Sequence, residues 1–160
     1  MVVSNTGPLV ALEAIGLTRL LAELFGNVSV SSRVRHEIEA GLGKPGADLF
    51  AHQTNWLQVM PDAPIPDQWI ANTLDAGEAA TIALALQQRS NLVIIDDRKG
   101  RRVAEQIYGL SVLGTLGILA RAKSAGLIKS VRPHLSQLQD SGYYLSDQLM
   151  EKVCRSCGEK

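Results

Sequence analysis

The apolar run from Leu92 to Ile95 is the feature that most constrains the fold, because it is short, β-branched and followed at once by two carboxylates, Asp96 and Asp97. Such a run predicts a strand buried on both faces, as in a parallel sheet. Ligands of open α/β sheets bind at the carboxyl ends of the strands. Because an unpaired buried charge is costly, the aspartates require a cation, a basic partner or water. They therefore predict a site at this edge of the sheet.

Strands and helices are expected to alternate along the chain. Short apolar runs predict further strands at 1–4, 27–30, 56–60 and 110–113. Apolar spacings and capping residues predict helices over 9–25, 32–40, 79–88, 98–108, 118–124, 131–140 and 147–156, with Gly43 near the end of the second. The pattern indicates an α/β protein, a three-layer α/β/α sandwich with a mainly parallel sheet. We expect one domain over 1–145, with 146–160 as its C-terminal helix and tail.

Composition excludes several classes of protein. The 160 residues carry 16 basic and 16 acidic side chains, so net charge gives no global sign of nucleic-acid binding. No signal peptide precedes the first strand, and no apolar run approaches the roughly 18 residues of a membrane span. We therefore expect a cytoplasmic protein without a membrane partner. Cys154 and Cys157 are the only cysteines, which excludes a disulfide framework.

Several chemical motifs are absent or weak. The chain contains no GxGxxG turn, no Walker A loop and no GxSxG nucleophile motif. His36, His52 and His134 lack the spacing of metal ligands, so we expect them at the surface. The spacing of Cys154 and Cys157 is that of a zinc ligand pair, but without a second pair the alternative is a reduced, frayed tail.

Three polar residues are candidates to join the two aspartates. Glu78 shares the apolar side of its helix with Ile82 and is expected to face the sheet from the first turn, where a carboxylate also gains from the helix dipole. Glu37 flanks the buried side of its helix, although a solvated helix end is the alternative. Asn5 follows the first strand, either in the layer of Asp96 or as a helix cap.

Oxygen ligands without histidines or thiols suit Mg²⁺ or Mn²⁺. Four cations follow the aspartates and either neutralise them or hold phosphates: Arg98, Lys99, Arg101 and Arg102. A divalent cation beside basic residues fits a substrate with a phosphate backbone, since the cation can polarise a phosphodiester and lower the pKa of water. A receiver-like phosphoacceptor pocket is disfavoured, because the aspartates come too late in the chain.

Four phrases in the same order resemble the PIN-like group of bacterial and archaeal proteins known as DUF3368. They are VVSNTGPL at 2–9, LDAGEA at 74–79, IDDRKGRR at 95–102 and GTLGIL at 114–119. The resemblance implies a metal-dependent ribonuclease, often the toxin of a toxin–antitoxin pair. RNA is then the expected substrate, a small antitoxin protein the expected partner, and a homodimer a further expectation.

The resemblance also implies roles for individual residues. Glu37, Glu78, Asp96 and Asp97 correspond to the catalytic, metal-binding acids, with Asn5 at the position of the first acid and Thr6 and Thr115 supporting the site. Most PIN nucleases carry aspartate where this chain has Asn5. An amide oxygen can bind a hard cation but brings no charge. The alternative is therefore a catalytically impaired PIN-like protein that binds protein or nucleic acid.

Overall fold

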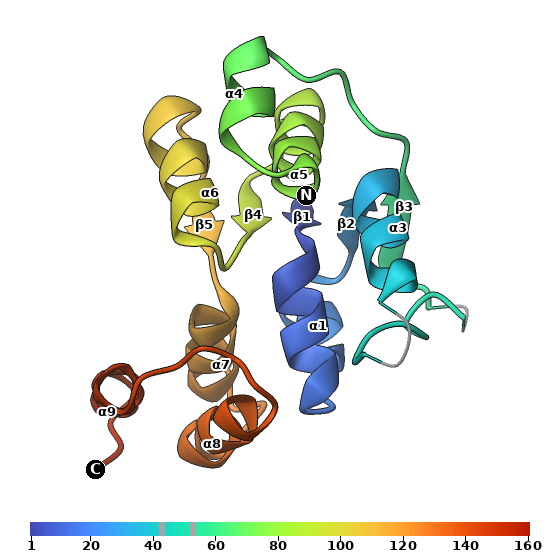
Figure 1. Ribbon diagram of the computed structural model, residues 1–160. Coiled ribbons are helices and arrows are strands. Elements are labelled where there is room, and N and C mark those ends of the chain that lie inside the picture. The colour runs from blue at the N-terminus through green and yellow to red at the C-terminus, as the bar shows by residue number, and fades with distance from the viewer. Residues whose placement is uncertain (42–43, 52–53) are drawn as a thin grey trace.

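A parallel sheet of five strands organises the computed structural model, which describes residues 1–41, 44–51 and 54–160 (Figure 1). The strands are β1 (Val2–Ser4), β2 (Val28–Ser31), β3 (Leu57–Met60), β4 (Leu92–Ile94) and β5 (Val112–Leu113). Their order is β3-β2-β1-β4-β5, so β1 and β4 are neighbours in the middle of the sheet. The expected mainly parallel sheet is confirmed, and the carboxyl ends of all these strands lie at one edge.

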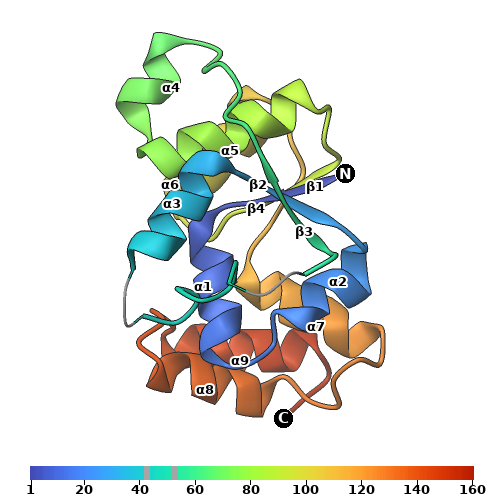
Figure 2. The same cartoon turned by 90° about the vertical axis from the view of Figure 1, so that its right-hand side faces the viewer.

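Helices cover both faces of the sheet (Figure 2). They are α1 (Thr6–Ala14), α2 (Arg19–Phe25), α3 (Ser32–Ala40), α4 (Gln68–Thr73), α5 (Ala76–Gln87), α6 (Arg98–Arg102), α7 (Thr115–Ser124), α8 (Arg132–Asp140) and α9 (Asp147–Ser156). A π-helical segment, η1 (Val103–Ile107), continues α6. One layer holds α4, α5 and α6, and the other holds α1, α2, α7, α8 and α9, while α3 contacts both α1 and α5. The predicted three-layer sandwich is confirmed.

Each face of the sheet has its own core because successive side chains of a strand point to opposite faces. Val2 and Ile94 pack with Leu12 and Ile118 in the larger core, on the side of α1 and α7. Val3 and Val93 belong to the second core, on the side of α5, with Ile82 and Ile95 among its members. Burial on both faces is what the β-branched strands predicted.

The expected single helix over 9–25 is wrong. The chain forms α1 and α2 instead, with Gly16 between them at a φ of 70°, in the left-handed region that glycine adopts without steric cost. Leu12 and Leu21 are both buried in the same core. The apolar spacing therefore continues across the break and conceals it.

Other boundaries differ by a few residues. The helix expected over 98–108 is divided into α6 and η1, α7 begins at Thr115 rather than at 118, and β5 is limited to 112–113. Ser31 and Ser146 accept hydrogen bonds from the third residue beyond them and so cap α3 and α9. Gly43 and His52 lie outside the described residues. Across the described ranges, no helix has the length and apolar character needed to span a membrane.

Candidate functional site

Glu78 is held in the first turn of α5 by a reciprocal cap. The Asp75 side chain accepts a hydrogen bond from the backbone N–H of Glu78 at 2.8 Å, and Oε2 of Glu78 accepts from the backbone N–H of Asp75 at 3.4 Å. Only 7% of Glu78 is exposed, which confirms the predicted buried position. Burial, and then the negative charges of Asp75 and Asp97, raise the pKa of Glu78 to about 7. Glu78 is therefore a carboxyl group that can hold a proton near neutral pH.

Asp96 and Asp97 follow β4, but their side chains have different neighbours. The Oδ1 atom of Asp96 accepts from the backbone N–H of Thr115 at 2.7 Å, and its Oδ2 atom accepts from the Thr115 hydroxyl at 2.6 Å. Asp97 caps α6 by accepting from the N–H of Gly100 at 2.9 Å. A Cβ atom built on Gly100 would lie 3.5 Å from Cδ of Glu78 and 3.7 Å from Oδ2 of Asp97. Glu78 and Asp97 therefore flank the same glycine.

Glu37 reaches the site from α3 although the residue as a whole is exposed. Its Oε2 atom accepts a hydrogen bond from the Thr6 hydroxyl at 2.7 Å. A Cβ atom built on Gly77 would lie only 2.5 Å from this same oxygen. The carboxylate thus lies directly over the backbone of α5, one residue before Glu78. Both expectations for Glu37 hold in part, because a solvent-exposed residue directs its carboxylate inward.

Asn5 joins the end of β1 to β4 and α5. Its backbone N–H donates to the carbonyl of Ile94 at 2.9 Å, and its side chain makes no capping hydrogen bond to α1. Instead, Oδ1 of Asn5 accepts from the hydroxyl of Thr81 at 3.4 Å. The residue is 8% exposed. The capping alternative is therefore wrong, and the amide faces the helix that carries Glu78.

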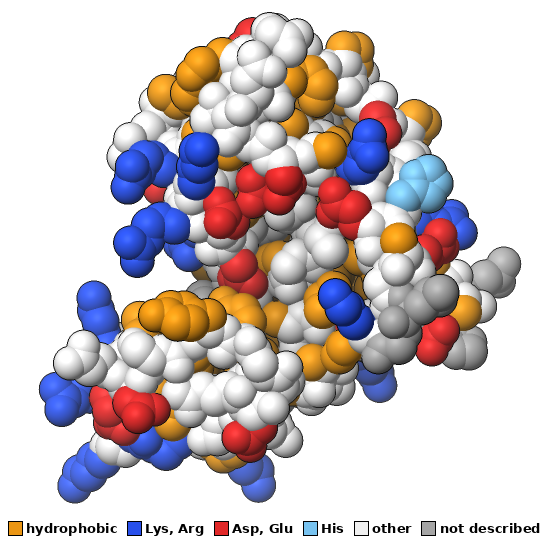
Figure 3. Space-filling view, viewed as in Figure 1, with side chains coloured by type: hydrophobic (Ala, Val, Ile, Leu, Met, Phe, Trp, Pro, Cys, Tyr) orange, Lys and Arg blue, Asp and Glu red, His pale blue; other side chains and the backbone are white. Residues whose placement is uncertain are grey.

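The candidate acids gather on one face of the molecule. Figure 3 shows acidic side chains across the middle of this face, with Lys and Arg to one side over α6. The ion pairs among the described residues are Arg35–Glu39, Lys123–Glu159 and Arg132–Glu151, so no cation lies within 4.0 Å of a candidate acid there. The neighbouring arginines were expected either to neutralise the acids or to hold phosphates. The described residues do not show the first of these roles.

The residues present fit a hard divalent cation by their chemistry. The carboxylates and the Asn5 amide supply only oxygen atoms, and Glu78 and Asp97 lie together without a positive neighbour in contact. The described residues do not already hold three or more His, Cys, Asp or Glu side chains close enough to ligate one ion. An ion would therefore have to draw these side chains together.

A cleft of about 930 Å³ opens beside the acids, between α6 and the segment that leads into α9. Asp96 and Asp97 lie at one end, and Arg98, Arg101 and Arg102 line one side. A Cβ atom on Gly114 would lie 2.9 Å from both Nη1 of Arg101 and Oδ1 of Asp96. The arginines are thus close to the acids without pairing with them. Lys99 is exposed on the same helix but does not line the cleft.

Three residues near the acids were not singled out from the sequence. The cap formed by Asp75 has a detectable signature, since an acid three residues before a glutamate at a helix start is the pattern of a capping box. Thr81 gives no such signal, because its proximity to Asn5 depends on how α5 packs against β1. Tyr143 lines the cleft from the far end of the chain, and burial followed by the charge of Asp96 raises its pKa above the ordinary value.

The remaining motifs lie away from the acids. His36 is exposed, and Nδ1 of His134 lies 3.2 Å from the side chain of Gln137, its neighbour on α8. Cys154 and Cys157 are free thiols, and Cys154 is fully buried in the larger core. The tail is reduced as expected but it is not frayed, since these cysteines belong to α9 and the residue that follows it. A buried thiol in an apolar core is packing rather than a metal ligand.

Comparison with known families agrees with this arrangement. Residues 1–159 match the family DUF3368, described as a PIN domain. The chain belongs to this PIN-domain family. PIN domains are generally nucleases and typically use divalent metal ions. No curated protein sequence matches the chain. The resemblance seen in the sequence is thus confirmed over nearly the whole chain.

Proposed function

We propose that this PIN-domain protein is a ribonuclease that depends on Mg²⁺ or Mn²⁺ and hydrolyses phosphodiester bonds at the carboxyl ends of β1 and β4. The observation that carries the proposal is the pairing of buried Glu78 with Asp97 across Gly100, beside Asp96 and without an ion pair among the described residues. Two acids in contact at a strand end are unfavourable unless a proton or a cation separates their charges. Membership of the PIN family supports the same reaction class.

In this proposal the acids bind the metal ion and neighbouring side chains orient the acids. The residues that would hold the ion are Glu37, Glu78, Asp96 and Asp97, with Asn5 contributing an amide oxygen. Thr6 and Thr115 keep two of the carboxylates oriented through their hydroxyl groups. The chemistry that a bound divalent cation supplies is polarisation of the phosphodiester and a lower pKa of the attacking water.

Basic residues beside the acids would hold the substrate. Arg98, Lys99, Arg101 and Arg102 lie in or next to the first turns after β4, and the three arginines line the cleft. Guanidinium groups suit phosphate oxygens because their planar donors form paired hydrogen bonds. With no carboxylate paired to them among the described residues, these cations remain available for a backbone.

The proposal includes the biological setting that the family resemblance supports. RNA is the substrate, the protein acts in the cytoplasm as the toxin of a toxin–antitoxin pair, and a small antitoxin protein and a second copy of the chain are its protein partners. A sequence-level likeness supports this setting, whereas the side-chain geometry supports the chemistry.

The proposal predicts metal binding that depends on the acids. Wild-type protein titrated with Mn²⁺ by calorimetry at neutral pH should bind at micromolar to low millimolar concentrations. Asp96→Asn and Glu78→Gln should each weaken binding and Mn²⁺-dependent RNA cleavage, by about 100-fold, because each removes a charge from the same site. Glu39→Gln is a matched control, since Glu39 lies on α3 close to Glu37 but pairs with Arg35 outside the site.

Thermal melts of each variant must accompany the titration, because Asp96→Asn also weakens the contact with Thr115. Mn²⁺-dependent cleavage that survives each substitution in folded protein would refute the proposed active site. Loss of binding in Glu39→Gln as well would show that the effect is not specific to the site.

A second candidate is a binding module that has lost its chemistry, and Asn5 favours it. The amide replaces the first acid of most PIN nucleases, and its oxygen already accepts a hydrogen bond from Thr81. The absence of a ready cluster of ligands among the described residues points the same way.

Asn5→Asp separates the two candidates. Adding a charge to the ligand set should tighten Mn²⁺ binding by about tenfold and lower the melting temperature of the metal-free protein, because a buried carboxylate then lies near other acids. A wild-type ribonuclease should cleave RNA before and after the substitution. Metal binding that is gained only in Asn5→Asp, with no cleavage by the parent protein, would favour the binding module.

A further inference from the structure

The cleft beside the acids has two walls of different chemistry. On one side lie Arg98, Arg101 and Arg102. On the other side lie Tyr143, Tyr144 and Leu149, from the segment before α9 and from α9 itself. Figure 3 shows the hollow between the two parts of the molecule, with apolar side chains on the part that faces the cations.

Tyr144 is the unusual member of the second wall. It is 94% exposed, and no hydrogen bond of its hydroxyl occurs among the described residues. Its neighbour Tyr143 is half-buried and close to Asp96. The two tyrosines are adjacent in the chain, so Tyr144 stands one residue from a side chain that contacts the acidic end of the cleft. A large exposed ring at the mouth of a charged cleft offers a flat surface for a planar ligand.

The two walls together match an unpaired nucleotide. Phosphates attract the arginines, whereas a base presents a π-face that stacks on an aromatic ring. In a duplex both faces of a base are covered by its neighbours and its edge is paired, so only an unstacked base can reach a protein ring. The charge of the first wall and the exposed ring of the second therefore favour a single strand.

We propose that Tyr144 stacks on an unpaired base of the substrate while the neighbouring phosphates lie against Arg98, Arg101 and Arg102. The inference deepens the proposed function, on which it rests for the identity of the strand as RNA. It makes Tyr144 a positioning residue that selects single-stranded over double-stranded substrate. The arginine wall supplies affinity without regard to sequence or strandedness.

Binding can be measured separately from cleavage. A single-stranded oligoribonucleotide that carries 2-aminopurine is titrated into wild-type protein in the presence of EDTA, so that no divalent metal takes part. Stacking should quench the 2-aminopurine fluorescence. Tyr144→Ala should weaken binding by about tenfold and abolish the quenching, whereas Tyr144→Phe should retain both because the ring remains.

Two controls distinguish stacking from other effects. Trp69→Ala removes another exposed aromatic side chain, 49% exposed on α4, that does not line the cleft, and should leave binding unchanged. Arg102→Gln should weaken the binding of single strands and duplexes alike and reduce the salt dependence, since it removes one phosphate contact. Because Tyr144 is almost fully exposed, its replacement should not lower the melting temperature.

Three outcomes uphold or overturn the stacking role of Tyr144. Equal affinity of wild type and Tyr144→Ala for the single strand, with weaker binding by Arg102→Gln, would overturn the stacking role and leave a phosphate surface only. No binding of any oligonucleotide would also overturn it. Binding that depends on Tyr144 in a protein that never cleaves RNA would uphold the inference and refute the proposed ribonuclease.

Discussion

Gly77 shows how a single missing side chain shapes the acidic site. It lies within α5, where glycine is about 1 kcal/mol less favourable than alanine because of its backbone freedom. Its value here is space, since the carboxylate of Glu37 occupies the volume in which a Cβ atom would lie. Glycine at this position lowers the intrinsic stability of α5, but it leaves room for the carboxylate of Glu37 next to the backbone that precedes Glu78.

Replacement of Gly77 separates folding from metal binding. Gly77→Ala should leave the melting temperature unchanged or slightly raised, because alanine favours the helix and Glu37 can swing into solvent. The same change should weaken Mn²⁺ binding by about tenfold, through displacement of the Glu37 carboxylate and loss of its hydrogen bond from Thr6. Calorimetry and thermal melts measure the two effects.

Glu37→Gln provides the comparison for that experiment, since it removes the charge but not the side chain. If displacement of Glu37 is the cause, the two variants weaken Mn²⁺ binding to a similar degree. Unchanged affinity in Gly77→Ala, alongside a loss in Glu37→Gln, would mean that the carboxylate binds the ion from another position.

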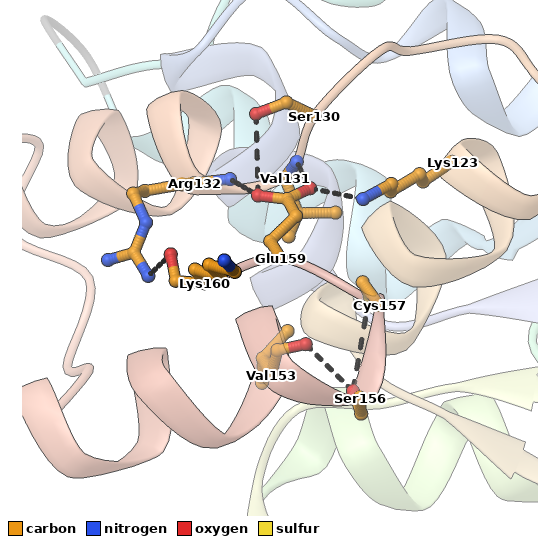
Figure 4. Close-up of polar contacts among 9 residues, drawn as sticks. All are labelled: Lys123, Ser130, Val131, Arg132, Val153, Ser156, Cys157, Glu159 and Lys160. Atoms are coloured by element: carbon orange, nitrogen blue, oxygen red, sulfur yellow. Dashed lines mark hydrogen bonds and ion pairs between the residues drawn. The ribbon is translucent and has the colours of Figure 1, made fainter.

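Among the elements, the carboxylate of Glu159 joins the end of the chain to α7 and α8 (Figure 4). Oε1 of Glu159 accepts hydrogen bonds from Nζ of Lys123 and from the backbone N–H of Val131, each at 2.7 Å. Its other oxygen accepts from the backbone N–H of Arg132 at 3.2 Å. The side chain therefore occupies the N-terminus of α8, where no local side chain caps the helix. Residue 159 thereby ties the segment after α9 to both α7 and α8.

This contact predicts a pH-dependent stability. The hydrogen bond from Lys123, followed by those from the backbone, lowers the pKa of Glu159 to about 2, against about 4.5 in the unfolded chain. The stabilisation is therefore complete above about pH 5 and is lost as the pH falls from about 4.5 through about 2. Glu159→Gln should lower the free energy of unfolding by about 1 to 3 kcal/mol at pH 7, with the difference vanishing over that acid range.

Denaturant titrations of wild type and Glu159→Gln across this pH range measure the effect. Glu151→Gln is the matched control, since Glu151 also pairs with Arg132 but its side chain is 47% exposed. Exposed pairs contribute little, so this variant should lose less stability than Glu159→Gln. If the free energy of unfolding still differs between wild type and Glu159→Gln at low pH, the charge of Glu159 is not the origin of the difference.

Most elements were predictable because their signals are local. Strands follow from β-branched runs, and the caps at Ser31 and Ser146 follow from side chains that satisfy nearby N–H groups. The break at Gly16 was not predictable, since the apolar residues of α1 and α2 share one core. Neither was η1, because the buried positions Val103 and Ala104 suit an α-helix equally well in sequence.

At the scale of the whole molecule, the acids were predictable and their surroundings were not. Asp96 and Glu78 carry positional signals, a strand end and a helix face. The proximity of Thr81 to Asn5 joins residues 76 positions apart and depends on the packing of α5 against β1. Tyr144 lines the cleft only because α7 and α8 carry the chain back to it. Such contacts come from tertiary packing, which periodicity does not encode.

Glu159 does not line the cleft, but its hydrogen bonds stabilise the part of the chain that forms one wall of it. The tyrosine wall comes from the segment between α8 and α9, and the Glu159 carboxylate adds hydrogen bonds at the N-terminus of α8 to the core packing that holds both helices. Occupancy of the cleft and docking of these helices are therefore linked equilibria, and each favours the other to the same degree. A ligand that contacts both walls would stabilise the packed position of the C-terminal helices. Local unfolding of those helices would in turn remove half of the surface that binds the ligand.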